Sequence, residues 1–345
     1  MQQFVRQQEF PSVQRQWNHS ILKPIPSARQ NNHVWSEISN ILNTESLTTK
    51  YFINMKKILI VLVSILMFTY VNVTAQVTVT YAMDTPTFTL AHEDTDRSQT
   101  LDTCYLTITY RFKYKATEKD DSLSHDDLMD LQLGRKNNAF FSRNLRDLDI
   151  QNTKELKTTM QFQTIPENYV GFDLLVNHRD STTIVTNRIP YTSQVIEYTE
   201  NTAAPNWEYI PDDIATVMGY HCHAAKCSYG GREWKVYYTN DIPLPYGPWK
   251  LNGVKGLILK AEDVDHDFIF EAEGLTQNPQ PIIRYEWNRK TMKKDDWERF
   301  EREMYQNAGS FVRNTGARII IMDNSEQGFH RLNEDWSQYY NPLEK

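Results

Sequence analysis

Several features that would point to a familiar class of protein are scarce or missing in this chain. It has only 3 cysteines among 345 residues, which allow one internal disulfide and leave one thiol over. After residue 75 there is no internal repeat and no linker rich in glycine, proline or serine, which favours one compact domain. The net charge is -7, which argues against nucleic acid or an anionic membrane surface as the main partner.

The signatures of well-known hydrolases are also missing. The chain contains no Gly-x-Ser-x-Gly elbow and no His-Glu-x-x-His motif, whereas covalent catalysis needs an activated Ser or Cys beside a positioned base. We therefore expect no catalytic residues and no cofactor, and we favour a protein without enzymatic activity. What is present is typical of a folded domain, because 40% of the residues are hydrophobic and 12% are aromatic.

An apolar stretch near residue 60 has the features of a secretory signal. The segment Ile58–Phe68 (ILIVLVSILMF) contains one polar residue, follows Lys56-Lys57 and precedes the small residues Val73 and Ala75. A basic start, a short apolar run and a small-residue cut site predict a signal peptide over 55–75, cleaved after Ala75. The run is shorter than the roughly 20 apolar residues that a membrane span needs, so no stable span is expected after cleavage.

The segment before this signal is expected to be an upstream mis-start. Residues 1–54 are rich in Gln and Asn and lack sustained hydrophobic periodicity, so we expect them to be disordered and Met55 to be the true first residue. The alternative is an ordered N-terminal domain followed by an internal anchor. With the first reading, residues 76–345 form one domain in the periplasm or outside the cell, and this mature part is more acidic than the whole chain.

Alternation with a period of two dominates the mature part. From Cys104 to Lys115 the even positions are apolar or aromatic and the odd ones mainly polar, which predicts a strand with one dry and one mostly wet face. Alternation also predicts strands over Val170–Val176 and Trp234–Tyr238, and β-branched residues predict Thr182–Ile189 and Gln194–Thr199, which Pro190 separates. Two more strands are expected over Leu257–Glu262 and Asp267–Ala272. The last two should form a hairpin around Asp263–His266. Half-wet strands are typical of antiparallel sheets, so the expected class is α+β, mainly β.

One amphipathic helix is expected near the C-terminus. Trp297, Phe300, Met304, Ala308 and Phe311 recur at steps of three and four residues, and therefore share one face. Acidic residues at 295 and 296 suit the first turn of this helix, and a glycine at 316 suits its end. A short buried strand should follow over Ala317–Met322, and Asn201–Asp213, with two prolines, is expected to be the longest loop.

Histidine and acidic residues offer two candidate metal sites. His221 and His223 would share one face of a strand and could bind Cu or Zn if His266 or Asp263 supplied a third ligand. Two solvated histidines beside a structural cysteine are the favoured interpretation. Asp263, Asp265 and Asp267 form an acidic hairpin tip, but their spacing lacks the glycine and terminal glutamate of a strong calcium loop, so we favour a solvated turn.

The cysteines are candidates for a disulfide, because export makes one plausible. Cys104 and Cys222 both fall on apolar faces of predicted strands and could pair. Cys222 and Cys227 are separated by about 16 Å if the chain is extended, so their pairing requires a reversal near Ser228–Gly231. The pairing is left open.

The block from Gly219 to Asp263 reads GYHCHAAKCSYGGREWKVYYTNDIPLPYGPWKLNGVKGLILKAED. It resembles a family of exported Bacteroidetes proteins named after its Gly-Leu-Pro-Gly-Leu-Ile (GLPGLI) motif. The match runs from about Cys104 to Glu344. It rests on these segments: Leu131-Gln132-Leu133-Gly134, Phe140-Phe141-Ser142, Gly219-Tyr220-His221-Cys222, Gly231-Arg232-Glu233-Trp234, Tyr237-Tyr238-Thr239, Ile242-Pro243, Gly247-Pro248-Trp249-Lys250, Gly256-Leu257-Ile258-Leu259 and Tyr340-Asn341-Pro342-Leu343-Glu344. The naming motif here reads Gly253-Val254-Lys255-Gly256-Leu257-Ile258, without the usual proline.

Most residues of the resemblance have a structural explanation. Gly247-Pro248 and the pair Gly253 and Gly256 predict tight turns, beneath which Trp249, Leu251, Leu257 and Leu259 can pack. Arg232 could pair with Asp241 or Asp263. The family has no established biochemical activity. Its members often neighbour genes of TonB-dependent receptors, which implies an envelope role, and a curved antiparallel sheet with a helix resembles the half-barrel of lipoprotein carriers.

Three functions are compatible with these features. The favoured one is a non-enzymatic binding or assembly module in the periplasm or on the cell exterior. It would hold an apolar ligand or an envelope protein in the hollow of a curved sheet, with Tyr238 and Trp249 as candidate lining residues. A metal-handling protein using His221 and His223, and an unrecognised hydrolase, are the alternatives.

Overall fold

The computed structural model describes residues 78–81, 88, 90–117, 123, 125–159, 163, 165, 169–316, 318–323, 328–331 and 335–345. The contacts of the chain divide it between Thr74 and Ala75, and the described residues all belong to the second unit. The predicted upstream extension and signal peptide lie outside the described residues. Among the described residues, no helix combines the length and apolarity that crossing a bilayer would require.

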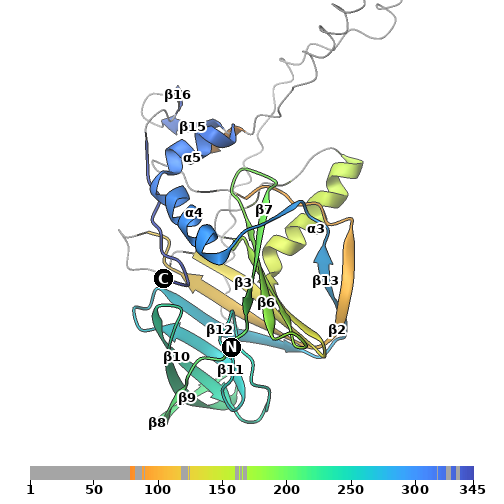
Figure 1. Cartoon of the computed structure of the whole chain (residues 1–345), viewed down its shortest axis with the longest axis vertical. Coiled ribbons are helices and arrows are strands. Elements are labelled where there is room, and N and C mark those ends of the chain that lie inside the picture. The colour runs from red at the N-terminus through yellow and green to blue at the C-terminus, as the bar shows by residue number, and fades with distance from the viewer. Residues whose placement is uncertain are drawn as a thin grey trace, which may run out of the picture. The chain divides into compact units, whose positions relative to one another are not determined.

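A single open, curved sheet of 13 strands dominates the described part of the chain. Its order is β14-β7-β6-β5-β4-β3-β2-β12-β11-β10-β9-β8, and β13 also pairs with β2. Neighbouring strands are antiparallel except β14 and β7, as expected for a mainly β protein (Figure 1). The strands are β2 (Ser98–Tyr114), β3 (His125–Gly134), β4 (Asn137–Ser142), β5 (Phe172–Asn177), β6 (Thr182–Arg188), β7 (Val195–Asn201), β8 (Glu208–Val217), β9 (Tyr220–Tyr229), β10 (Arg232–Thr239), β11 (Leu257–Asp263), β12 (Phe268–Thr276), β13 (Gln280–Tyr285) and β14 (Arg289–Thr291).

The alternation of β2 is found as predicted on one face and differs on the other. Ile108, Tyr110 and Phe112 are at most 2% exposed and belong to the main core. On the opposite face, where a mostly wet surface was expected, Thr107 and Thr109 are each 7% exposed. Thr109 donates to Asp130 on β3, at 2.8 Å, so the middle of this face is covered, whereas Tyr105 and Lys113 on the same face are exposed as expected.

The turn between β11 and β12 is the predicted hairpin. The two strands pair antiparallel, and His266 in the turn has a φ of 56°, in the left-handed region. Phe268, Phe270 and Ala272 face inward and are at most 3% exposed. The period of two therefore identified both the strands and the buried face of this hairpin correctly.

The C-terminal helical region is broken where one helix was predicted. Helix α4 (Lys294–Gln306) and helix α5 (Ala308–Thr315) meet at Asn307, whose φ of -119° and ψ of 43° interrupt the helix. Trp297, Met304 and Ala308 are all buried, so the apolar stripe continues across the break. Gly316 ends α5 in the left-handed conformation, with a φ of 81°, as predicted.

A further helix and a small separate sheet complete the described elements. Helix α3 (Arg143–Thr158) was not predicted; Ser142 caps it by accepting from Leu145 N at 3.0 Å. It packs on β3 and β4, whereas α4 contacts β7. Strands β1 (Thr78–Tyr81), β15 (Arg318–Asp323) and β16 (Gly328–Arg331) form a sheet of three, in the order β1-β15-β16. The strand predicted at 317–322 corresponds to β15.

The prediction of a long loop over Asn201–Asp213 is wrong at both ends. Asn201 is the last residue of β7, and β8 already begins at Glu208. Pro211 lies within β8, where the register to β9 shifts between Ile210 and Ile214. An edge strand can carry a proline at such an irregularity, because one side of it needs no ladder hydrogen bonds.

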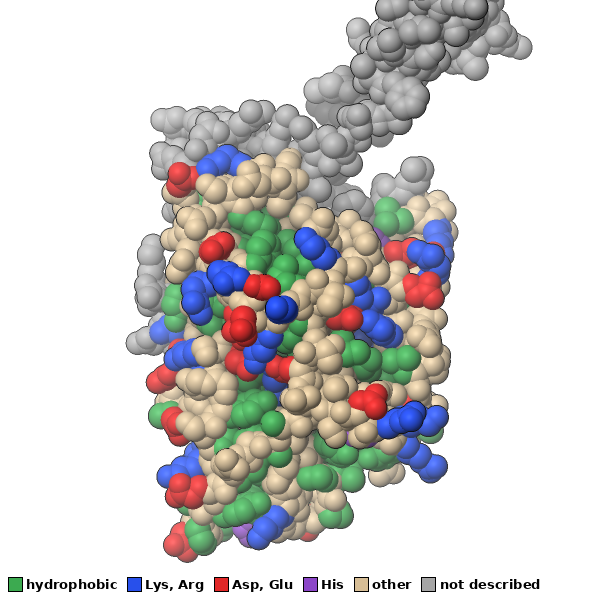
Figure 2. All heavy atoms as spheres, viewed as in Figure 1, with side chains coloured by type: hydrophobic (Ala, Val, Ile, Leu, Met, Phe, Trp, Pro, Cys, Tyr) green, Lys and Arg blue, Asp and Glu red, His purple; other side chains and the backbone are tan. Residues whose placement is uncertain are grey.

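Charged side chains are mixed in sign on the face seen in Figure 2, where lysine, arginine, aspartate and glutamate side chains alternate around a central cluster. Ion pairs between such side chains occur in the described part of the chain, for example between Lys294 and Glu200 at 3.0 Å. This face therefore carries no large patch of a single sign.

Candidate ligand-binding pocket

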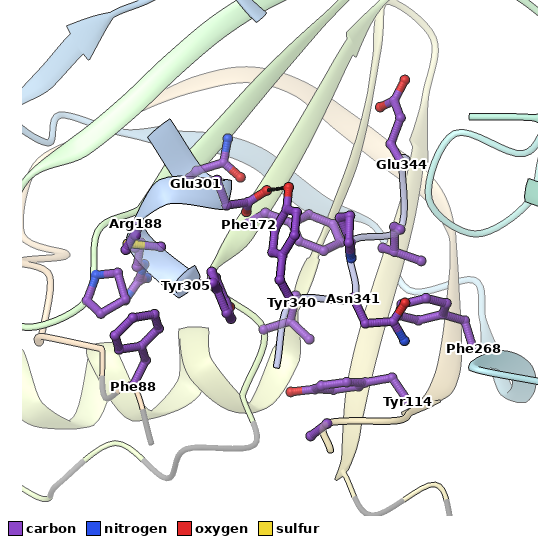
Figure 3. Close-up of a pocket in the computed structure, with 18 of the residues that line it drawn as sticks. Phe88, Tyr114, Phe172, Arg188, Phe268, Glu301, Tyr305, Tyr340, Asn341 and Glu344 are labelled. Atoms are coloured by element: carbon purple, nitrogen blue, oxygen red, sulfur yellow. Dashed lines mark hydrogen bonds between the residues drawn. The ribbon is translucent and has the colours of Figure 1, made fainter. Parts of the chain in front are cut away.

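One cavity, called the main cavity from here on, lies between the main sheet, helix α4 and the C-terminal segment, residues 335–345. Its volume is about 270 Å³. Strands β2, β5, β6, β7 and β12 supply one wall, and α4 and residues 338–344 supply the other. Aromatic side chains dominate the lining (Figure 3), and they are Phe88, Phe112, Tyr114, Tyr169, Phe172, Tyr198, Trp249, Phe268, Trp297, Tyr305, Tyr339 and Tyr340.

The C-terminal segment is held against this cavity by contacts with several elements. Arg232 on β10 donates from Nη2 to the carbonyl oxygen of Pro342 at 2.6 Å. Lys250 donates to Glu344 at 2.6 Å. The backbone N–H of Lys345 donates to the carbonyl oxygen of Gly230 at 2.8 Å. The stretch from Tyr340 to Glu344, which is one of the segments on which the family resemblance rests, therefore forms part of the wall of the cavity.

A carboxyl group on α4 contacts the same segment. The hydroxyl of Tyr340 donates to Oε2 of half-buried Glu301 at 3.1 Å, the bond dashed in Figure 3. Burial raises the pKa of Glu301 to about 7, Glu298 adds to this effect, and the bond from Tyr340 opposes it. Glu301 therefore titrates near neutral pH, unlike an ordinary solvated carboxyl group.

A second polar centre borders the cavity at Arg188 on β6. Nη2 of Arg188 pairs with Asp149 on α3, and the two side chains are 6% and 1% exposed. Asp149 also accepts from the backbone N–H of Glu93, at 3.1 Å, and contacts Nδ1 of His92, at 3.3 Å. Although burial opposes ionisation, bonds from His92 and Arg188 hold the pKa of Asp149 below its ordinary value.

Glu93 in this centre is buried without full pairing. Glu93 is 5% exposed, and its Oε1 has no hydrogen-bond partner among the described residues. Burial raises the pKa of Glu93 to about 7, against the lowering effect of Arg188. Two carboxyl groups in one centre are thus driven in opposite directions, Asp149 toward ionisation and Glu93 toward the neutral acid.

The two candidate lining residues from the sequence are separated in the structure. Trp249 lines the main cavity and also a second cavity of about 200 Å³. Its φ of 53° is unusual for a bulky residue. Tyr238 lines neither of these cavities; its ring packs near those of Tyr209, at 5.9 Å, and His223, at 6.0 Å.

The histidine pair lies on one face, as predicted. The ring centroids of His221 and His223 are 5.1 Å apart on β9. A metal site needs several ligand atoms close together. Among the described residues, Asp263, Asp265 and Asp267 form such a group, and it includes neither histidine. In the sheet, Asp263 lies opposite Trp234 near one end of β10, and His223 lies opposite Tyr238 near the other end. The proposed third ligand Asp263 is therefore remote from the histidine pair.

The acidic hairpin tip is only partly solvated. Asp263 is 1% exposed and its oxygens accept from Arg232, at 2.9 Å, and from the backbone N–H of Phe268, at 2.8 Å. Arg232 also contacts Asp267, at 3.4 Å. The expectation of a solvated turn is therefore wrong for Asp263, which is part of a buried ion pair, while Asp265 is exposed.

No disulfide joins the described cysteines, so the disulfide expected from export is not found. Cys104, Cys222 and Cys227 are free and buried. Cys104 is on β2, and three strands separate β2 from β9, which carries Cys222; four strand spacings are about 19 Å. The reversal near Gly230 comes after Cys227, so Cys222 and Cys227 stay on one extended strand, beyond bridging distance.

The glycines of the motif allow backbone segments to approach closely. A Cβ on Gly256 would lie 1.9 Å from the carbonyl oxygen of Thr239. Gly219 and Gly253 have φ values of 82° and 89°, which glycine adopts readily. A Cβ on Gly247 would come within 2.7 Å of Ile258. Five apolar side chains that follow Pro248 are buried, each at most 7% exposed: Trp249, Leu251, Leu257, Ile258 and Leu259.

Arg232 pairs with Asp263, one of the two partners considered from the sequence, and both side chains are 1% exposed. Sequence reasoning missed Glu93, Asp149, Arg188 and Glu301. Of these, only Glu301 had a usable signal: it lies four residues after Trp297 and three before Met304, and therefore on the apolar stripe of α4.

The fold and the cavity together define a mainly β protein with an open curved sheet and an aromatic-lined pocket. No family model and no curated protein matches the chain. Two solved structures of PNGF-II, in space groups P21 and C2, are similar in part, with TM-scores of 0.36 and 0.37 and identities of 15% and 14%. Each covers 58% of this chain, which spans about a third of their length (33% and 32%).

Proposed function

We propose that the protein is an exported, non-enzymatic binding or assembly module of the bacterial envelope and belongs to the GLPGLI family. The signal-like segment 55–75 and the motifs between Cys104 and Glu344 support export and family membership. A partner in the envelope, such as a TonB-dependent receptor system, remains part of this proposal on the resemblance alone.

The observation that carries the binding role is the aromatic-lined cavity. Ligand sites are concave, lined mainly by hydrophobic and aromatic side chains, and contain a few polar groups. The cavity combines its rings with the polar side chains of Arg188, Glu301 and Asn341. A ligand with an apolar surface therefore fits this lining.

Two of the thiols are poorly suited to act as nucleophiles. Cys104, Cys222 and Cys227 are buried, and burial raises the pKa of Cys222 and raises that of Cys227 to about 12. A thiol with a raised pKa is a poor nucleophile at neutral pH.

Fluorescence titration with 1-N-phenylnaphthylamine, an uncharged apolar dye, tests the binding role. The dye should bind in a 1:1 ratio, and Ala116→Trp, which places an indole at the cavity wall, should weaken binding at least tenfold. Thr216→Trp, at an exposed position on β8, is the control and should leave binding unchanged. No dye binding, or equal loss in both variants, would contradict the proposal.

Intact mass spectrometry of the protein from its native envelope fraction tests export. A mass that begins at Gln76 agrees with cleavage after Ala75. A mass that includes residues 1–54 would show that the assignment of the N-terminus, and with it the compartment, is wrong.

A further inference from the structure

Four polar atoms buried at the main cavity have no hydrogen-bond partner among the residues that the structure describes. Three are donors, Asn187 Nδ2, Arg188 Nη1 and Asn341 Nδ2, and one is an acceptor, Gln338 Oε1. All four residues line the cavity, and the side chain of Arg188 is only 6% exposed. Because buried polar atoms are nearly always paired in folded proteins, these atoms indicate a ligand that itself carries hydrogen-bonding oxygens.

Each of the three charged groups Arg188, Lys250 and Glu301 nevertheless has at least one partner, although Nη1 of Arg188 has none in the described part of the chain. Arg188 pairs through Nη2 with Asp149. Lys250 contacts both Glu200, at 2.5 Å, and Glu344, at 2.6 Å. Glu301 accepts from Tyr340. A charged ligand would have to compete with these bonds, whereas an uncharged ligand can use the unpaired amides without disturbing them.

Three aromatic side chains of the cavity form a row in which neighbouring rings meet edge to face or tilted, so their faces point in different directions. The rings of Phe88 and Tyr305 have centroids 5.0 Å apart, and those of Tyr305 and Tyr340 are 5.3 Å apart. Figure 3 shows this row with Arg188 near its Phe88 end and Asn341 beyond Tyr340. Aromatic faces carry partial negative charge, and therefore attract the polarised C–H groups of a sugar ring.

Resting on the proposed binding function, we infer that the main cavity binds an uncharged sugar unit through the aromatic row Phe88, Tyr305 and Tyr340 and the unpaired donors of Asn187, Arg188 and Asn341. A hydrocarbon would pack on the rings but leave the four polar atoms unpaired. The volume of about 270 Å³ is just below the roughly 300–1,000 Å³ of drug-sized sites, which limits the buried part to one or two rings.

Isothermal titration calorimetry on the mature chain tests the ligand class with matched probes. The neutral probes are glucose, N-acetylglucosamine and its β-1,4 disaccharide; glucuronate and glucosamine carry one negative and one positive charge on the same ring. At least one neutral probe should bind, and its charged counterpart should bind at least about tenfold more weakly, because a charged ring would have to compete with the ion pairs that Arg188 and Lys250 already form.

Two isosteric variants test the contacts. Asn187→Asp and Asn341→Asp each replace an unpaired donor by an acceptor, and Asn341→Asp keeps the oxygen that accepts from Arg232. Each should weaken binding of the neutral probe about tenfold, as expected for one lost hydrogen bond with a partner left unpaired. Asn240→Asp, at an exposed site outside the cavity, should keep the wild-type Kd.

The dye and the sugars together separate failure of the inference from failure of the proposed function. If the dye binds but none of the neutral sugars does, the binding role stands and the sugar inference is wrong. If the dye binds and the charged sugars bind as tightly as the neutral ones, the inference is wrong in the same way. If neither dye nor sugar binds, both proposals fail. Dye binding by the two aspartate variants shows that they are folded.

Discussion

Two buried arginine centres in this protein differ in how completely they are paired. At Arg232, every guanidinium nitrogen has a partner: Nη1 contacts Asp263, Nη2 contacts Asn341 and Pro342, and Nε contacts Pro342. At Arg188, Nη2 pairs with Asp149 but Nη1 has no partner in the described part of the chain.

The difference separates scaffold from candidate site. The Arg232 centre joins β10, the β11–β12 turn and the C-terminal segment, so its complete pairing holds distant parts of the chain together. The Arg188 centre borders the cavity, where unpaired polar atoms and a carboxyl group with a raised pKa remain. Functional sites are where folded proteins most often depart from complete pairing.

Removing the guanidinium of the complete centre should have the largest effect. Arg232→Met leaves Asp263 as a buried charge without its partner, and we expect the free energy of unfolding to fall by about 3–5 kcal/mol. Chemical denaturation monitored by tryptophan fluorescence measures this loss. The double variant Arg232→Met, Asp263→Leu should regain most of it, and a double variant as unstable as the single one would contradict this assignment.

Removing the guanidinium of the incomplete centre should have a smaller effect on stability. Asp149 keeps its contacts with His92 and the backbone N–H of Glu93, so Arg188→Met should lower the free energy of unfolding by about 1–3 kcal/mol. The same denaturation experiment, run beside Arg232→Met, gives the difference directly. Equal losses in the two variants would mean that the centres do not differ as proposed.

The pH dependence of stability should sharpen the comparison further. The pKa of Glu93 is raised to about 7 in the folded protein from 4.5, so the folded state binds more protons than the unfolded state between these values, and stability falls as pH rises through this window. Glu93→Gln should reduce the fall between pH 5 and pH 8 by on the order of 1–3 kcal/mol.

Denaturation curves at several pH values measure this effect. Glu301, with its pKa also raised to about 7, should preserve part of the fall in the variant. Glu286→Gln is the control, because the side chain of Glu286 is 57% exposed. A wild-type protein whose stability does not fall from pH 5 to pH 8 would show that Glu93 ionises normally.

The smallest effect is expected at the histidine pair, which lies outside both centres. The double variant His221→Asn, His223→Asn should change the free energy of unfolding by less than about 0.5 kcal/mol per site, as is usual for substitutions without buried partners. Equimolar Zn²⁺ should not shift the melting temperature of the wild-type protein, since the described residues place no third ligand beside the pair. A clear shift that disappears in the double variant would restore the metal-handling hypothesis.

The alternation of side chains was enough to predict much of the sheet. Strands β2, β10 and β12 follow from the period of two, because their even-numbered positions are mostly buried. Strands β6 and β7 follow instead from their β-branched residues. Helix α3 was missed because apolar residues are sparse along it and two of its buried residues are the polar Asp149 and Asn152. Edge strand β8 was missed because Pro211 resembles a loop signal.

The sequence by itself determined the class of the fold and the apolar stripe of the C-terminal helices, because these depend on the local spacing of apolar residues. Only the tertiary structure decided the rest. The cavity joins side chains from β2, β6, α4 and the C-terminal segment, which are far apart in the chain, and no local pattern records such a meeting. The separation of the cysteines and the incomplete pairing of Arg188 depend in the same way on which strands and helices become neighbours.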